Sequence, residues 1–171
     1  MCYFLYLASP LTLSEVRSML PSGLTVDLAS FSDQQSLKAL HPEAQTVARI
    51  LAGRCSCDLV RARLPDTKQD ERHLRQRYRG LGISRATVIA ALERHRLGAA
   101  VGWAEETGQG GLARFVAEHA RNAGPTLYYL YFSATTDQLP RLGDTRRIQA
   151  ADVILKPGDW LEEDSPTLVT R

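Results

Sequence analysis

The sequence contains few cysteines and no long apolar run. Only three cysteines occur in 171 residues, and an odd number with two of them one residue apart is a poor basis for a disulfide framework. Residues two apart in a strand also rarely have disulfide geometry. No stretch approaches the roughly 18 continuous apolar residues of a membrane-spanning helix. These absences favour a cytoplasmic protein in a reducing compartment and predict no transmembrane segment.

The familiar motifs of catalysis are also missing. The chain has no H-x-x-x-H, G-x-S-x-G, Walker-type or dinucleotide-binding glycine motif. The glycine-rich GQGG at 108–111 has no lysine after it, so we expect a loop there. We expect the four histidines, His41, His73, His95 and His119, to pack or to cap. The sequence therefore favours a protein that is not an enzyme and that needs no cofactor.

The opening residues, MCYFLYLAS, are apolar and aromatic. They lack a basic region before the apolar run and small residues after it, so they predict a first strand rather than a signal peptide. Thr12 and Glu15 have capping-box spacing, which predicts the start of a helix. Residues 24–28 then alternate between apolar and polar, as in a half-buried strand. The chain thus begins as β-α-β.

The rest of the chain continues to mix helices and strands. A helical connector is expected at 31–41, helices at 42–51, 66–79, 84–96 and 112–123, and strands at 55–61, 126–133 and 167–170. This interleaving predicts an α/β or α+β fold with a layered, central mixed sheet flanked by four to six helices, and a ferredoxin-like plait is one arrangement that fits. We expect a single domain over 1–171, with 66–111 as a mostly helical basic insertion and 144–171 as a less regular tail.

The strongest predicted strand is TLYYLYFS at 126–133. Both of its faces are apolar, which favours a central strand covered on both sides. In the alternative, one tyrosine face stays open to stack bases or to receive a partner. YYLYFSA at 128–134 also repeats the Y-x-L-Y pattern of YFLYLAS at 3–9, which indicates two strands in similar settings.

Positive charge is concentrated in one stretch of the chain. Residues 54–96 hold 11 Lys and Arg and 5 Asp and Glu, whereas the whole chain has a net charge of only +2. Within it, 74–96 resembles a helix-turn-helix, and SRATV at 84–88 resembles the start of a recognition helix. That resemblance implies contacts to bases and phosphates. The alternatives are a solvated basic face or a site for an acidic protein. The candidate contact residues are Arg72, Arg75, Arg77, Arg79, Arg85, Arg94 and Arg96.

The cysteines form the second candidate site. In a strand, Cys55 and Cys57 would share a face, and Cys2 would lie in another strand. Three thiolates and a histidine could hold Zn²⁺, and Arg54 and Arg61 could favour thiol chemistry by stabilising a thiolate. Otherwise the cysteines pack as small apolar residues.

The start Met1-Cys2 also resembles glutamine amidotransferases of the N-terminal nucleophile class. That resemblance implies Cys2 as a nucleophile after removal of Met1, with the free amine as its base. Tyr3 stands where that family has glycine.

These patterns together predict a non-catalytic binding or accessory protein. Its basic helical face, residues 72–96, would contact an acidic protein partner or nucleic acid. The alternative is a thiol- or metal-dependent protein that uses Cys2, Cys55 and Cys57, with zinc as the metal. The sequence leaves the oligomeric state open.

Overall fold

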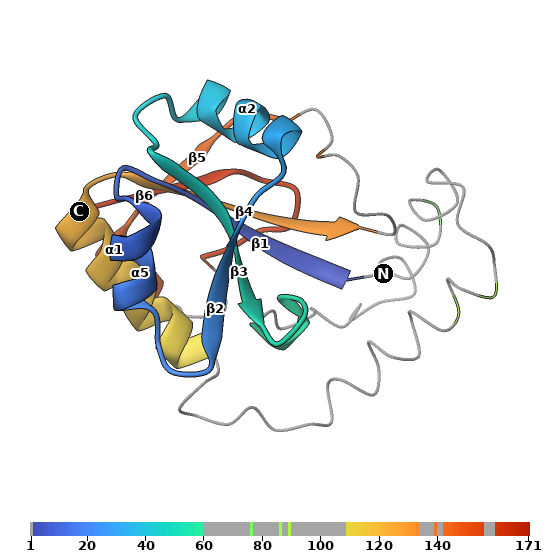
Figure 1. Cartoon of the computed structure of the whole chain (residues 1–171), viewed down its shortest axis with the longest axis horizontal. Coiled ribbons are helices and arrows are strands. Elements are labelled where there is room, and N and C mark those ends of the chain that lie inside the picture. The colour runs from blue at the N-terminus through green and yellow to red at the C-terminus, as the bar shows by residue number, and fades with distance from the viewer. Residues whose placement is uncertain are drawn as a thin grey trace.

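A computed structural model describes residues 2–59, 109–133, 142–155 and 160–171, together with the single residues 76, 86, 89 and 139. Its elements follow one another along the chain, and most of them are labelled in Figure 1. They are β1 (Cys2–Ser9), α1 (Leu13–Met19), β2 (Leu24–Leu28), α2 (Phe31–Leu40), β3 (Thr46–Ala52), the short 3₁₀ helix η1 (Cys57–Leu59), α5 (Gln109–Ala123), β4 (Thr126–Ser133), β5 (Arg146–Gln149), α6 (Ala150–Leu155) and β6 (Thr167–Thr170).

The strands form one mixed sheet, which confirms the predicted layered fold. Their order is β2-β3-β1-β4-β6-β5, and all neighbours are antiparallel except β5 and β6. Consequently β1 and β2 run parallel with β3 between them, and β3 and β4 run parallel with β1 between them. A ferredoxin-like arrangement, which contains two split β-α-β connections, is compatible with this strand order.

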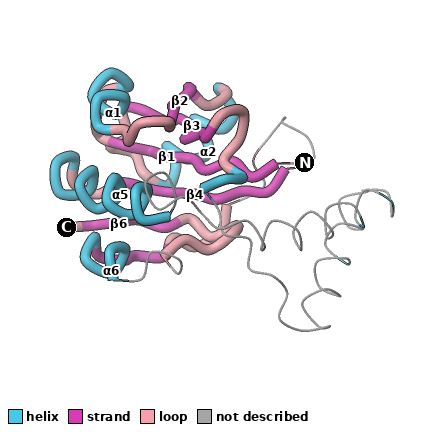
Figure 2. The backbone as a smooth tube through the Cα atoms, turned by 90° about the horizontal axis from the view of Figure 1, so that it is seen from below, coloured by secondary structure: helices cyan, strands magenta, loops and turns pink. Residues whose placement is uncertain are grey.

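The helices lie on both faces of the sheet. Helices α1, α5 and α6 cover one face, called here the α5 face, and Val16, Val116 and Val153 contribute to its core. Helix α2 covers the opposite face, called here the α2 face, where Leu37 packs. Figure 2 shows α1, α5 and α6 beside one another in front of the strands. None of the described helices has the length and apolar character needed to cross a membrane.

The two aromatic strands are neighbours at the centre of the sheet. β1 and β4 pair directly, with Tyr6 opposite Tyr129 and Leu7 opposite Tyr128. Tyr128 and Tyr129 point to opposite faces, and no more than 1% of either side chain is exposed. The prediction of a central strand covered on both sides is therefore confirmed. The related patterns at 3–9 and 128–134 belong to adjacent strands of similar burial.

Three local predictions were wrong. Residues 46–52 form strand β3 rather than part of a helix. Residues on both faces of β3 are buried, so its apolar side chains do not alternate with polar ones as in a half-buried strand. The expected strand at 55–61 begins instead as a turn followed by η1. Helix α5 starts at Gln109, so it includes two glycines that were expected in a loop.

Candidate functional site

The predicted basic contact residues lie outside the residues that the structure describes. This applies to Arg72, Arg75, Arg77, Arg79, Arg85, Arg94 and Arg96. Gln76, Ala86 and Ile89, which are interspersed with them, are helical, in agreement with the predicted helices. His73 and His95 also fall outside the described residues.

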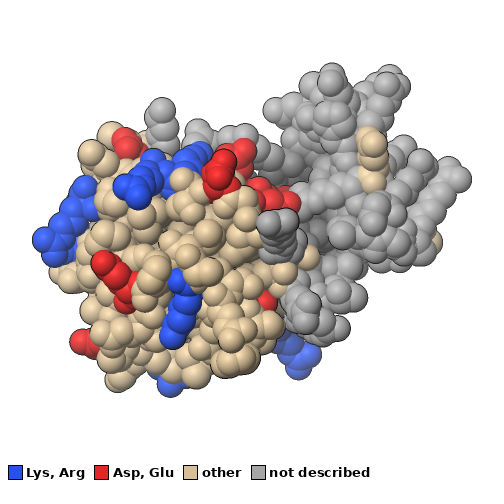
Figure 3. Space-filling model, turned by 90° about the horizontal axis from the view of Figure 1, so that it is seen from above, with Lys and Arg blue, Asp and Glu red and all other residues tan. Residues whose placement is uncertain are grey.

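Charge is spread more evenly over the described part of the chain. It holds 9 Lys and Arg and 11 Asp and Glu, a net charge of −2. In Figure 3, charged residues on this part of the molecule are dispersed among uncharged ones. Glu162, from the acidic stretch near the C-terminus, lies 3.7 Å from Arg146. The excess of positive charge therefore belongs to the stretch between β3 and α5.

The second predicted site lies where β3 ends and the chain turns back. Gly53 has a φ of 72°, which suits glycine, and the amide of Ala52 donates to the carbonyl of Cys55. The Cys55 and Cys57 side chains are both partly exposed. The turn thus presents two sulfur atoms at one end of the sheet.

Hydrogen bonds attach this turn to β1. The amide of Tyr3 donates to Cys57 Sγ over 3.3 Å, and the amide of Cys57 donates to Cys55 Sγ over 3.4 Å. Ser56, fully buried between them, donates to the Ile50 carbonyl over 2.5 Å and accepts from the Leu5 amide over 2.8 Å. These bonds replace the ladder that β3 would have continued along β1. Ser56 and Cys57 therefore have a structural role whatever else the thiols do.

Cys2 reaches the same end of the sheet through its backbone. It begins β1, pairs with Ser133 of β4, and directly precedes Tyr3, whose amide contacts Cys57. Among the described residues, no group of three or more Cys, His, Asp or Glu could hold a metal ion. Zinc binding by the three cysteines stays a prediction.

A buried serine–histidine pair, which no sequence pattern predicts, joins β1 to α5. Ser9 Oγ lies 2.7 Å from His119 Nε2 and accepts from the Leu11 amide over 3.0 Å. Both side chains are fully buried, and Nδ1 of His119 has no hydrogen-bond partner. Burial lowers the pKa of His119 to about 4, so the ring is neutral at pH 7. Neither group can touch a substrate in this arrangement, and His119 is a packed histidine, as predicted.

The α2 face holds a second buried polar group. Asp33, in the first turn of α2, accepts from the Tyr6 hydroxyl over 3.2 Å and from the Leu139 amide over 3.1 Å. Burial and this carboxylate raise the pKa of Tyr6. The guanidinium of Arg49, which is opposite Tyr6, lies 5.4 Å from the centre of the Phe4 ring. Phe4, Tyr6 and Asp33 are buried, so this cluster holds α2 on the sheet.

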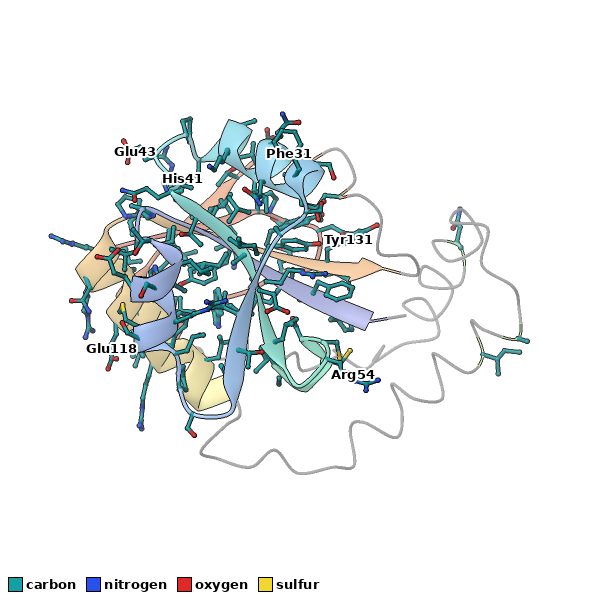
Figure 4. All side chains as sticks on the ribbon, viewed as in Figure 1. Phe31, His41, Glu43, Arg54, Glu118 and Tyr131 are labelled. Carbon is teal, nitrogen blue, oxygen red and sulfur yellow. The ribbon has the colours of Figure 1, made fainter. Side chains whose placement is uncertain are left out.

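No family model, curated protein or solved structure matches this chain. Among the described residues, the reactive side chains of Cys55 and Cys57 are both partly exposed on one turn. Figure 4 shows the exposed Arg54 at the tip of this turn. His41 serves the fold, because its Nε2 lies 3.0 Å from the carbonyl oxygen of Pro125.

Proposed function

We propose that this chain is a non-catalytic binding or accessory protein whose basic segment, 72–96, contacts a polyanion. The partner is nucleic acid or an acidic protein surface. The observation that carries the proposal is the separation of charge. The described residues have a net charge of −2, whereas residues 60–96, of which only three uncharged positions are described, hold 10 Lys and Arg and 4 Asp and Glu, a net charge of +6.

Arginine is suited to this role. All seven candidate contact residues are arginines, and a guanidinium donates two parallel hydrogen bonds to a carboxylate or a phosphate. A dense group of such residues raises the local potential and speeds association with an anionic partner. Where the partner is nucleic acid, binding also releases condensed counterions, so affinity depends steeply on salt.

A salt titration tests this proposal. Fluorescence anisotropy of the full chain with labelled random-sequence DNA, RNA and an acidic peptide should detect binding at low salt. For nucleic acid with four phosphate contacts, the plot of log affinity against log salt should have a slope of about −3 to −4. A slope near −1 with the acidic peptide as the preferred ligand would favour the protein partner. Absence of binding to all three ligands at low salt would overturn the proposal.

Charge reversal locates the contact. The triple variant Arg75→Glu, Arg77→Glu, Arg79→Glu should bind at least tenfold more weakly and reduce the salt slope by about 3. A matched control changes three exposed arginines of the described part of the chain to glutamate, with the same change in net charge. They are Arg114, Arg121 and Arg147. Equal losses in the two triple variants would indicate a general charge effect and contradict a defined contact face.

We propose as a second candidate a thiol- or metal-dependent role for Cys2, Cys55 and Cys57. It is supported by the partly exposed thiols of Cys55 and Cys57 and by their attachment to the strand that Cys2 begins. Elemental analysis and alkylation near pH 6.5 test it. Bound metal, or a thiol that reacts at least tenfold faster than in the urea-unfolded chain, would support this role. Metal-free protein with three slow thiols would contradict it.

A further inference from the structure

Strand β2 lies at one edge of the described sheet, at the top of the view in Figure 2. In an antiparallel pair, successive residues direct their backbone amide and carbonyl alternately toward and away from the neighbouring strand. The amide of Ala29 donates to the carbonyl of Val47 over 3.1 Å. Every second residue back from Ala29 therefore faces β3, whereas Leu24, Val26 and Leu28 direct their backbone groups to the outer edge.

Two of these outer groups already have partners within the chain. The Leu24 amide donates to the carbonyl of Pro21 over 3.2 Å, and the Val26 carbonyl accepts from the exposed Arg17 over 3.4 Å. A carbonyl has a second lone pair, so the Val26 carbonyl can accept again. Among the described residues, no acceptor meets the amides of Val26 or Leu28. The edge can therefore still pair with a strand from another molecule.

The side chains of β2 are self-complementary in one antiparallel register. With a two-fold axis beside Val26, each Leu28 lies opposite Leu24 of the second copy, and each Thr25 lies opposite Asp27 of the second copy. Leu28 is 54% exposed, so this pairing covers it with an apolar side chain. The Thr25 hydroxyl can donate to the Asp27 carboxylate across the pair.

The two neighbouring registers fit less well. An axis beside Asp27 places the two Asp27 carboxylates directly opposite each other, and like charges in that position repel. An axis beside Thr25 leaves Leu28 opposite a residue that precedes the strand, because β2 begins at Leu24. Charge and burial thus favour the register centred on Val26.

The other edge of the described sheet has a different character. Strand β5 begins with Arg146 and Arg147, and positive side chains on an edge strand discourage pairing. Strand β2 contains neither lysine nor arginine. Of the two edges, β2 is therefore the one suited to pairing with a copy of itself.

We propose that two copies of this chain pair antiparallel through β2, which joins their two six-stranded sheets into one. Each Val26 amide donates to the Val26 carbonyl of the second copy, and each Leu28 amide donates to the Leu24 carbonyl. The interface is isologous, as in most homodimers. Because the paired strand is short, the dimer dissociates on dilution. This inference is independent of both proposed functions.

Sedimentation velocity of the full chain, from micromolar to near-millimolar concentration, tests the proposal. The unmodified chain should pass from monomer to dimer over this range. Leu28→Lys should weaken the dimer at least tenfold, and it should fold because this side chain is already half exposed. The matched control is Leu155→Lys on α6, where the leucine is 76% exposed, and it should stay within threefold of the unmodified chain. A chain that is monomeric throughout, or equal weakening by both lysines, would overturn the proposal.

Arg17 supplies a variant with the opposite sign. Its bond to the Val26 carbonyl competes with the proposed pairing, so Arg17→Ala should tighten the dimer at least threefold. A weaker dimer in this variant would contradict pairing at the Val26 edge.

Amide hydrogen exchange, followed by NMR, locates the interface without any variant. The amides of Val26 and Leu28 should exchange at least tenfold more slowly at the concentration where the dimer predominates than in the dilute monomer. A dimer in which both amides exchange at the monomer's rate would place the interface elsewhere and overturn the pairing of β2.

Discussion

The two faces of the sheet bury their polar side chains in different ways. On the α2 face, Asp33 accepts from a hydroxyl and from a backbone amide. On the α5 face, His119 shares one hydrogen bond with Ser9 and leaves its other ring nitrogen unpaired. The buried Asp33 carboxylate thus accepts from two donors, whereas the buried His119 ring has one hydrogen-bond partner and is neutral at pH 7.

This difference follows from the cost of burying charge. An ionised group in an apolar interior is tolerated only when hydrogen bonds or opposite charges compensate for lost water. Asp33 obtains donors from β1 and from the segment at Leu139, and Arg49 adds positive charge on the same face. No charged neighbour contributes to the lowered pKa of His119, for which burial is the cause. The free energy of unfolding should therefore fall when a hydrogen-bond partner is removed on the α2 face. It should also fall when His119 would have to be protonated on the α5 face.

The largest expected effect comes from removing the carboxylate. Asp33→Ala leaves the Tyr6 hydroxyl and the Leu139 amide without their acceptor, and each unsatisfied buried donor costs about 1–3 kcal/mol. We expect the free energy of unfolding to fall by about 4 kcal/mol, measured by urea denaturation. As a control, alanine at the exposed Asp144 should change it by less than about 0.5 kcal/mol. A similar small change at Asp33 would show that the α2 face does not depend on this carboxylate.

Much of this fold was predictable because its elements have strong local signals. The capping box of Thr12 and Glu15 is present, and the aromatic strand 126–133 is central and covered. Strand β3 was mistaken for a helix because burial on both faces removes the alternation that marks a strand. Neither β5 nor α6 was predicted, since elements this short carry little periodic signal.

The candidate sites were predictable only in part. The cysteines could be selected by residue type, but the turn that orders Cys55 and Cys57 depends on bonds to β1, more than 50 residues away in sequence. Ser9 and His119 are 110 residues apart. Nothing local in the sequence marks them as partners, and only the pairing of the strands and the packing of α5 bring them together.

The next largest effect is a loss of stability in acid. The pKa of His119 is about 4 in the folded chain, whereas an unburied histidine, as in the unfolded chain, has a pKa of 6.5. As the pH falls from 6.5 to 4, the unfolded chain therefore gains this proton and the folded chain does not. The free energy of unfolding should therefore decrease over that range by up to about 3 kcal/mol, with no contribution from this group above pH 7. Urea denaturation at several pH values measures the loss.

Variants separate His119 from the other titrating groups. His119→Phe cannot gain this proton, so its stability should fall less than that of the unmodified chain between pH 6.5 and 4. A matched variant, His41→Phe, keeps His119 and should retain the acid-dependent loss that His119 causes. If His119→Phe and the unmodified chain lose stability in parallel, the buried imidazole is not the group responsible.

The smallest effect should come from the serine of the buried pair. Ser9→Ala removes the partner of His119 Nε2 and the acceptor of the Leu11 amide, and we expect a loss of about 1–2 kcal/mol at pH 7. The loss should be smaller when His119 is already phenylalanine, because one of the two unsatisfied groups is then absent. A double-mutant cycle measures this coupling, which should be about 1 kcal/mol. Purely additive losses would mean that Ser9 stabilises the Leu11 amide alone, and that the α5 face buries His119 without net support from a hydrogen bond.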